Sequence, residues 1–313
     1  MASPIVVFAY KRPDKIINLL DRLSQNKLAK ESDLFIFCDG YKSDKDREDV
    51  LKTQTTVSKY INDVLSPNSL FASVKIQLAE KNRGLATSVI SGVTSVLSEY
   101  ESVIVLEDDL EVSNDFLEFM NGALEYYKDD SRIGAISGYT YPVKALDGFG
   151  KDVYFLKKGD CWGWATTKNV WNNASWANIS FNDYYGNMKN RRSFEKLECY
   201  FDQTMCYQLE GKMDSWAIRW VYHLYKNNMY TVYPTQTKVS NNGFDGSGTH
   251  CVKEEKYAAN PSTPVNDAHM EFIPFFENKK LEKECAVYPR NNILKYLRDR
   301  LKINIKYILG KEL

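Results

Sequence analysis

Short apolar runs alternate with amphipathic stretches along the first part of the chain. The runs are rich in Val, Ile, Leu and Phe and are too short for buried helices, so they predict inner strands of a parallel sheet. They cover residues 5–10, 33–38, 74–79, 102–106 and 133–137. The stretches that repeat apolar residues at helical spacing cover 13–23, 44–64, 86–97 and 116–124. This alternation predicts a Rossmann-like α/β fold with a mainly parallel central sheet flanked by helices.

Single residues predict where several helices begin. Pro13 suits a first helical turn, because the N–H that it lacks is not needed there. Gly84 permits an unusual backbone angle ahead of the helix that starts near residue 86. Ser113 or Asn114 is suited to cap the helix that follows the fourth strand.

Aromatic residues and Gly become dense after residue 137. This change suits a substrate-facing second half of the same domain rather than a separate domain. We therefore divide the chain into a first half at 1–137, a second half at 138–260 and a C-terminal extension at 261–313.

Two segments of the second half have contrasting patterns. Residues 215–228 place Trp216, Trp220 and Leu224 on one side, which predicts a helix. Residues 241–250 contain too much Gly and Asn for regular structure and predict a flexible loop that could order over a ligand.

The composition excludes several classes of protein. With 43% hydrophobic residues and 41 basic residues against 41 acidic ones, the 313-residue chain is neither disordered nor a basic nucleic-acid-binding protein. Its six cysteines lack zinc-ligand spacing, which predicts free thiols. Because we find neither a signal-peptide pattern nor an apolar stretch long enough to cross a bilayer, we expect a cytoplasmic protein.

Three consecutive carboxylates close the fourth predicted strand, at Glu107, Asp108 and Asp109. Ligands of open α/β sheets bind beyond the carboxyl ends of the strands. Adjacent acids repel one another there unless a cation or hydrogen-bond donors relieve the repulsion. Oxygen-only ligands suit Mg²⁺ or Mn²⁺, whose coordination a diphosphate can complete. The acids therefore predict a metal-diphosphate site, with a solvated acidic turn as the alternative.

Other polar residues follow the neighbouring strands and are expected at the same edge of the sheet. They are residues 10–12, Asp39, residues 82–84 and, later in the chain, Asp214. Cations for phosphates and carboxylates for a ribose and a metal are the groups that a nucleotide diphosphate needs.

Several motifs, spread over residues 4–252 in a fixed order, resemble one known family. They are LEDDLEV at 106–112 followed by Asp115-Phe116, Phe8-Ala-Tyr-Lys-Arg12, Cys38-Asp39, Trp162-Gly-Trp164, Asp214-Ser-Trp216 and Gly248-Thr-His250. Together they resemble the N-acetylglucosaminyltransferase I type of GT-A glycosyltransferase, and most of all the bacterial enzymes of that type. The resemblance implies a GT-A fold whose first half binds a nucleotide-sugar and whose aromatic-rich second half binds the acceptor.

The resemblance also implies roles for the strand-end residues. Asp109 would ligate Mn²⁺ or Mg²⁺, and Glu107 and Asp108 would hold the ribose and the donor sugar. Asp39 would accept a hydrogen bond from uracil. The residues implied beside the nucleotide are Ala9, Tyr10 and Arg12. Arg83 would contact the diphosphate, with a surface cation as the equal alternative.

The second-half motifs imply further roles. Asp214 would act as the general base that removes the proton of the acceptor hydroxyl. The family has two adjacent acids before the Trp, whereas Ser215 replaces the second one here, so the alternative for Asp214 is a helix N-cap. His250 would contact the diphosphate or the metal. Trp162 and Trp164, around Gly163, would stack on sugar faces, with packing as the alternative for at least one of them.

The C-terminal residues 291–313 contain a basic amphipathic pattern. Apolar residues at helical spacing alternate with Lys and Arg, which suits a helix lying on an anionic membrane surface. A helix packed on the domain, or a dimer contact, is the alternative. The apolar positions are Leu294, Leu297, Leu301, Ile305, Ile308 and Leu309.

We therefore expect an inverting, Mn²⁺- or Mg²⁺-dependent hexosyltransferase. Its donor would be a UDP-sugar, with UDP-GlcNAc first, and its acceptor a glycan or lipid-linked saccharide of bacterial surface polysaccharide assembly, at the inner face of the plasma membrane. A sugar-phosphate nucleotidyltransferase is one alternative, although residues 8–12 lack the Gly-rich loop of that class. A catalytically silent carbohydrate-binding protein on the same fold is the other. The oligomeric state is left open.

Overall fold

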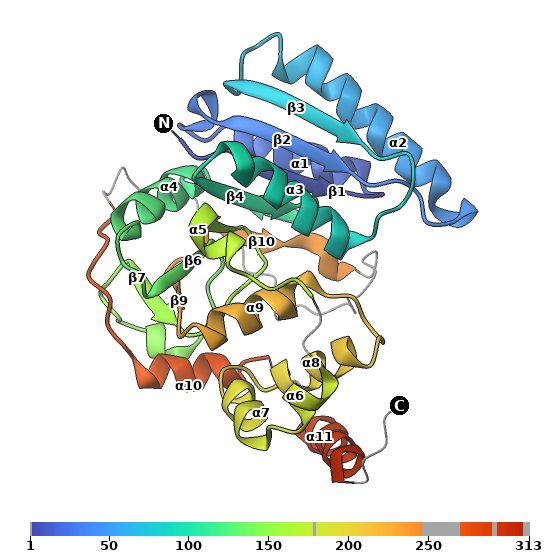
Figure 1. The fold of residues 1–313 in the computed structure, drawn as a ribbon. Coiled ribbons are helices and arrows are strands. Elements are labelled where there is room, and N and C mark those ends of the chain that lie inside the picture. The colour runs from blue at the N-terminus through green and yellow to red at the C-terminus, as the bar shows by residue number, and fades with distance from the viewer. Residues whose placement is uncertain (1, 178–179, 246–269, 290–292, 309–313) are drawn as a thin grey trace.

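The protein is built around one eight-stranded sheet with the strand order β3-β2-β1-β4-β8-β6-β9-β7 (Figure 1). The computed structural model describes residues 2–177, 180–245, 270–289 and 293–308. Four neighbouring strands, β3, β2, β1 and β4, are parallel. Beyond β4, the β6–β9 pair is parallel, and β8 and β7 run antiparallel to their neighbours. The expected α/β fold with a mainly parallel central sheet is confirmed.

Strands and helices alternate along most of the first half, as the sequence predicts, but the short strand at Leu110–Val112 follows β4 directly and is not predicted. The strands are β1 Ile5–Ala9, β2 Asp33–Cys38, β3 Ser73–Leu78, β4 Ser102–Glu107, β5 Leu110–Val112, β6 Ile133–Ser137, β7 Val153–Leu156, β8 Trp164–Thr167, β9 Tyr230–Pro234 and β10 Val239–Asn241. The helices are α1 Pro13–Ser24, α2 Asp44–Tyr60, α3 Leu85–Glu99, α4 Phe116–Tyr127, α5 Lys168–Asn172, α6 Phe181–Tyr185, α7 Met188–Glu195, α8 Phe201–Leu209, α9 Trp216–Lys226, α10 Lys279–Val287 and α11 Ile293–Ile308.

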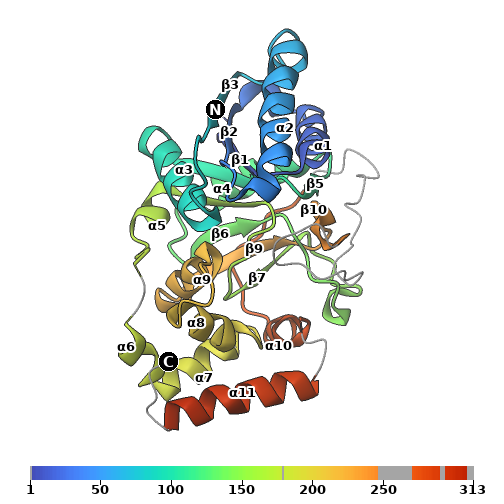
Figure 2. The same ribbon diagram turned by 90° about the vertical axis from the view of Figure 1, so that its right-hand side faces the viewer.

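Alternate residues of β1 pack into the two layers that cover the sheet. Ile5 and Val7 join the cluster formed with α1, α2 and α4, whereas Val6 and Phe8 join the cluster formed with α3, α5 and α9. Every residue of β1 is buried, as expected of an inner strand that is covered on both faces (Figure 2). Because the sheet continues from the first half into the second, the two halves share one core.

Two helix starts that single residues predict are as expected, whereas α4 begins at Phe116 as expected but without the predicted cap. α1 begins at Pro13, and Gly84 has a φ of 77° ahead of α3. Neither Ser113 nor Asn114 caps α4, whose cap position is Asp115. The Ser113 hydroxyl instead bonds to Asp115, and a residue from another part of the chain, Asn26, accepts the 2.9 Å bond from the backbone N–H of Leu117.

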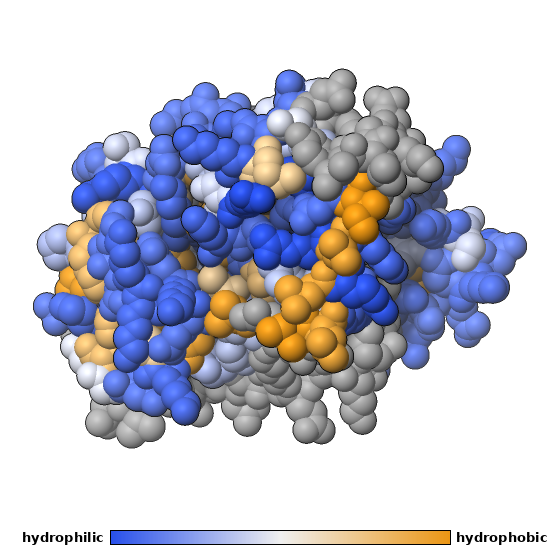
Figure 3. Space-filling model, turned by 90° about the horizontal axis from the view of Figure 1, so that it is seen from below, coloured by the Kyte–Doolittle hydropathy of each residue, from blue (hydrophilic) through white to orange (hydrophobic). Residues whose placement is uncertain are grey.

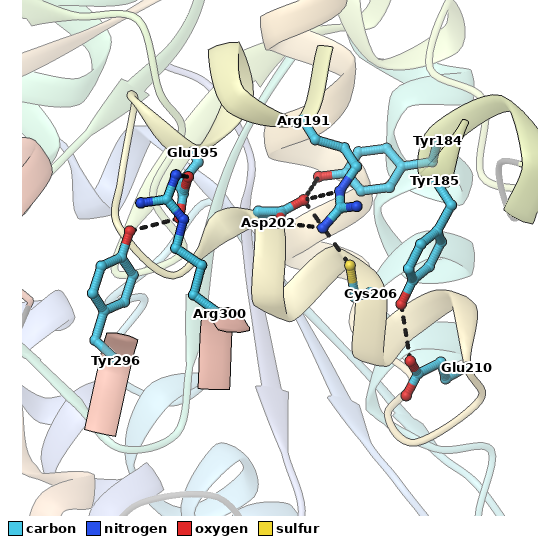
Figure 4. A network of polar contacts seen from close by, with 9 residues as sticks. All are labelled: Tyr184, Tyr185, Arg191, Glu195, Asp202, Cys206, Glu210, Tyr296 and Arg300. Carbon is cyan, nitrogen blue, oxygen red and sulfur yellow. Dashed lines mark hydrogen bonds and ion pairs between the residues drawn. The ribbon is translucent and has the colours of Figure 1, made fainter. Parts of the chain in front are cut away.

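The second half adds a layer of small helices below the sheet. Arg191 of α7 donates two 2.9 Å hydrogen bonds to Asp202 of α8, and Tyr184 of α6 donates another (Figure 4). The charged pair ties the three helices together. The helix predicted at 215–228 is confirmed as α9.

Other expectations for the second half are only partly met. The first half of the predicted loop 241–250 is regular, which differs from the prediction. Its first residue ends β10, and Asn242–Asp245 forms a 3-10 turn. The rest of that loop lies outside the described residues. The five described cysteines are free, as predicted, and Cys251 lies outside the described residues. Within the described ranges, we find no helix with the length and apolar character needed to span a membrane.

Candidate functional site

The candidate site lies where the order of the parallel strands changes direction. From β1 the chain moves outward to β2 and β3 and then returns to β4 on the other side of β1. Ligands of open α/β sheets bind beyond the carboxyl ends of the strands at such a switch point. Here those ends carry Tyr10 to Arg12 after β1, and Glu107, the last residue of β4, with Asp108 and Asp109 after it.

Arg12 binds both aspartates of the acidic turn. Its Nη1 donates to Asp109 Oδ2 at 3.0 Å, and its Nη2 donates to Asp108 Oδ1. The backbone N–H of Tyr10 donates to the other oxygen of Asp108 at 3.1 Å. Burial raises the pKa of Asp108, whereas the charge of Arg12 opposes that shift. Arg12 therefore supplies a cation from within the chain, and the acids do not require a bound metal to relieve their repulsion.

Glu107 is the third acid and is stabilised in a different way. Burial, followed by the charges of Asp109 and Asp108, raises the pKa of Glu107 to about 8. Arg12 and a side-chain hydrogen bond with Trp216 act in the opposite direction. Since the indole N–H of Trp216 can only donate, it binds a carboxyl oxygen of Glu107. Near neutral pH the Glu107 carboxyl is therefore largely protonated, and this second effect also relieves the repulsion.

A segment far along the chain lies directly against Asp109. β10 pairs antiparallel with β5, and the 3-10 turn after β10 brings Gly243 to the acidic turn. The backbone N–H of Asn242 donates to the Asp109 carbonyl at 2.8 Å. A Cβ atom on Gly243 would lie 2.2 Å from Asp109 Oδ2, so a larger residue here would require the Asp109 carboxylate to shift. We did not predict this contact from the sequence, where the density of Gly indicated only a loop.

Asp39 is already fully engaged at the edge of the site. Its two oxygens accept hydrogen bonds from the backbone N–H groups of Gly40, Arg83 and Gly84 and from the side chain of Asn82, at 2.8–3.1 Å. An ionised carboxylate has about four acceptor positions. Asp39 therefore holds the 82–84 turn against the end of β2, and its contact with uracil stays a prediction.

The side chains of two other predicted residues point away from the acids. Tyr10 donates from its hydroxyl to Asp46, and burial followed by that bond raises the pKa of Tyr10 to about 12. The exposed Arg83 donates to Ser91 of α3 at 3.0 Å. Ala9 is buried at the end of β1, so only its backbone is open to a role beside a ligand.

Asp214 stands just ahead of α9, and its side chain is 65% exposed. Ser215, not Asp214, is the N-cap, because its hydroxyl accepts from the backbone N–H of Ile218. The N-cap alternative for Asp214 is therefore wrong. Arg219 donates to Asp214 Oδ1 at 2.7 Å. Trp216, two residues further on, binds Glu107, so the start of α9 approaches the acids.

The Trp-Gly-Trp motif is mainly structural. Trp164 is 1% exposed and packs within 5.1–5.7 Å of the rings of Trp171, Trp216 and Trp220, so the expected contact between Trp164 and a sugar is wrong. Gly163 has a φ of 60° and leaves no room for a Cβ beside Val239. Trp162 is partly buried with its ring edge-on to Tyr139, and its sugar contact stays a prediction.

The carboxylates of the acidic turn are of the type that binds a divalent cation, but they do not form a complete set of metal ligands. Across the described ranges, no three His, Cys, Asp or Glu side chains are grouped to hold a metal ion. The oxygen donors at the acidic turn are those that Mg²⁺ and Mn²⁺ prefer, and phosphate oxygens commonly complete such a shell. Asp109 is the carboxylate that could contribute. His250, the other predicted ligand, lies outside the described residues.

The comparisons with known proteins find only distant likeness. No protein-family model and no curated protein matches the chain. Solved structures that share part of the fold include residues 1–349 of S. aureus TarS, with 14% identity and a TM-score of 0.35 over 53% of this chain and 47% of that one. A second structure of TarS, a glycosyltransferase, has 10% identity and a TM-score of 0.40 over 74% and 36%.

A cytidylyltransferase from Leptospira borgpetersenii has 13% identity and a TM-score of 0.33 over 56% of this chain and 63% of that one. This chain thus spans less than two thirds of each of these structures. At such TM-scores the neighbours assign no activity. What the fold and the site define is an α/β protein with a charged strand-end site at its switch point.

Proposed function

We propose that this chain is an inverting, metal-dependent glycosyltransferase with a nucleotide-sugar donor. One observation carries the proposal: Arg12, Asp108 and Asp109 form a charged cluster at the switch point, where α/β sheets bind nucleotides. Two of the motifs that resemble the GT-A family, at residues 8–12 and 106–112, supply these three residues. UDP-GlcNAc is the first donor to test, and a glycan or lipid-linked saccharide of a bacterial surface polysaccharide is the proposed acceptor.

The donor would take over contacts that the acids and Arg12 now make with each other. Arg12 can turn its planar guanidinium from Asp109 to a phosphate, which it binds with two parallel hydrogen bonds. Asp109 would then be available to a divalent cation, which supplies Lewis-acid stabilisation of the leaving diphosphate when bound. A protonated Glu107 can donate a hydrogen bond to an oxygen of the ribose or sugar.

Asp214 is the proposed general base. It is exposed, so an acceptor can reach it, and the bond from Arg219 fixes its orientation. It lies just ahead of α9, whose first residue, Trp216, contacts Glu107. Inverting transfer needs a carboxylate that takes the proton of the acceptor hydroxyl on the face opposite the leaving group.

Calorimetry and a donor panel test this proposal. UDP is titrated in the presence of Mn²⁺ or EDTA, and a panel of nucleotide-sugars with Mn²⁺ is scored for hydrolysis and thermal protection. Asp109→Asn should abolish the dependence of UDP binding on Mn²⁺. Asp214→Asn should keep UDP binding and lose at least about 100-fold in transfer.

Glu118→Gln is the matched control, because Glu118 is an acid near the same segment whose partner is the exposed Lys27. Equal UDP binding with Mn²⁺ and with EDTA would contradict the metal role. Failure to bind any nucleotide-sugar would contradict the whole proposal. Pyrophosphate release from a nucleoside triphosphate and a sugar phosphate would instead identify a nucleotidyltransferase.

A further inference from the structure

Helix α11 presents a row of large apolar side chains to solvent. The exposed fractions are 54% for Ile293, 76% for Leu294, 50% for Leu297, 60% for Leu301 and 45% for Ile305. We call these five residues the apolar stripe. Ile293 and Leu294 are adjacent, and from Leu294 onward the residues follow at intervals of three or four, which places the five along one side of the helix. Viewed from below, they form a continuous orange band over the position of α11 (Figure 3).

The opposite side of α11 is fixed to the domain. Tyr296 and Ile303 are buried, and Ile303 packs in the cluster built by α6 to α9. The Tyr296 hydroxyl donates to Glu195 of α7 at 2.6 Å, and Arg300 donates to the other oxygen of Glu195 at 2.8 Å (Figure 4). These contacts fix the rotation of the helix about its axis. The stripe is therefore held facing solvent.

This orientation is the reverse of the usual one. A helix on a globular domain normally turns its apolar stripe toward the core and its charges toward water. Contiguous exposed apolar surface usually marks a site of interaction with a protein or a membrane. Helix α11, which carries the stripe, lies along the lower edge of the molecule in Figure 2.

Basic residues border the stripe. Lys295, Arg298 and Lys302 are exposed beside it. Over its full length the helix carries five basic residues and one acidic residue, whereas the whole chain has a formal net charge of zero. Positive charge is therefore concentrated next to the apolar surface.

We propose that α11 docks the protein on an anionic lipid bilayer. An apolar stripe bordered by Lys and Arg suits a helix that lies in the plane of the bilayer, with Leu and Ile among the acyl chains and the cations near the headgroups. A second copy packed stripe to stripe would bring two basic borders together, which opposes that pairing. The docking surface is separate from the acidic site and goes beyond the proposed transferase activity.

Vesicle flotation with the full chain tests the inference. Vesicles of phosphatidylcholine are compared with vesicles that also contain phosphatidylglycerol. The chain should float with the anionic vesicles, and added salt should weaken this binding. Leu297→Gln combined with Leu301→Gln should reduce partitioning at least about tenfold. The matched control combines Leu51→Gln with Leu78→Gln, two leucines with 43% and 44% exposure elsewhere on the surface.

Two readouts separate the outcomes. Replacing Lys295, Arg298 and Lys302 with Gln should remove the preference for anionic vesicles while the fold, followed by circular dichroism, is kept. Failure of the chain to bind anionic vesicles would overturn the inference, as would a dimer that the two stripe substitutions dissociate. UDP binding, measured on the same variants, should not change, so a wrong donor assignment and a wrong docking surface are distinguishable.

Discussion

Two regions meet at the end of β4 and are stabilised by opposite means. The acidic turn contains three carboxylates that depend on particular partners: Arg12, a backbone N–H and the indole of Trp216. Behind it, Trp164 and three further indoles form a packed stack that depends on shape. Trp216 belongs to both, because it stacks on Trp164 at 5.1 Å and binds Glu107.

This difference separates the residues that can take part in chemistry, at the acidic turn, from those that mainly stabilise the fold, in the indole stack. A charge that is held by one partner can be released to a ligand, whereas the rings of the stack contribute mainly through packing, with Trp216 as the one that also binds an acid. Substitutions in the stack should therefore change the free energy of unfolding, and substitutions at the turn should also change the pH dependence.

The largest effect is expected for Trp164→Ala. Removing a buried indole from the centre of the stack leaves a cavity and should lower the free energy of unfolding by about 3–5 kcal/mol. Urea denaturation followed by circular dichroism measures this. The UDP affinity of the protein that stays folded should be nearly unchanged. A loss of UDP affinity without a loss of stability would contradict this and would show that Trp164 contacts the ligand.

Arg12→Met should cost about 3 kcal/mol, because it leaves Asp108 buried without its cationic partner. The same denaturation experiment applies. The double variant Arg12→Met with Asp108→Asn should recover part of the loss, since the uncompensated charge is then gone. An equal loss in both variants would show that Arg12 acts through packing alone.

The pH dependence of stability should identify Glu107. Its pKa is about 8 in the folded protein against a usual value of 4.5, so the folded state holds a proton that the unfolded state releases. The stabilisation is complete below about pH 4.5 and is lost as the pH rises through 8. Denaturation at a series of pH values should give a flatter profile for Glu107→Gln than for the unaltered chain.

Trp216→Phe should have the smallest effect on stability, about 1 kcal/mol, because a ring remains in the stack. It removes the donor to Glu107, and the pKa of that carboxyl should rise further. The observable is a shift of the pH profile toward higher pH. Trp220→Phe, in the same helix and stack, is the control that should leave the profile in place.

Local patterns made much of the fold predictable. Five of the six strands of the first half were found because each is a short apolar run that ends in a polar turn, whereas the three-residue β5 was not. Helices α1 and α3 were found because Pro13 and Gly84 mark their starts. The acceptor for the first turn of α4 was not predicted, because the N–H of Leu117 binds Asn26, which lies 91 positions away in the sequence. A contact between residues so far apart in the sequence cannot be predicted from the residues next to the helix start.

The candidate site was predictable in its location but not in its contacts. Parallel strands bring their ends together, so the acids and Arg12 could be placed at one edge. The sequence suggested a metal as the cation there, yet Arg12 sits 97 positions from Asp109 and pairs with it directly. Trp164 was misassigned because a Trp beside Gly is equally compatible with a sugar platform and with a core.

The bare backbone of Gly243 has a consequence for how this site can vary among related chains. Any larger residue would push the carboxylate of Asp109 aside, so the two positions are mechanically linked across more than a hundred residues. We expect chains that keep the acid triplet to keep a glycine after the strand corresponding to β10, and chains that lose the aspartate to be released from that restriction.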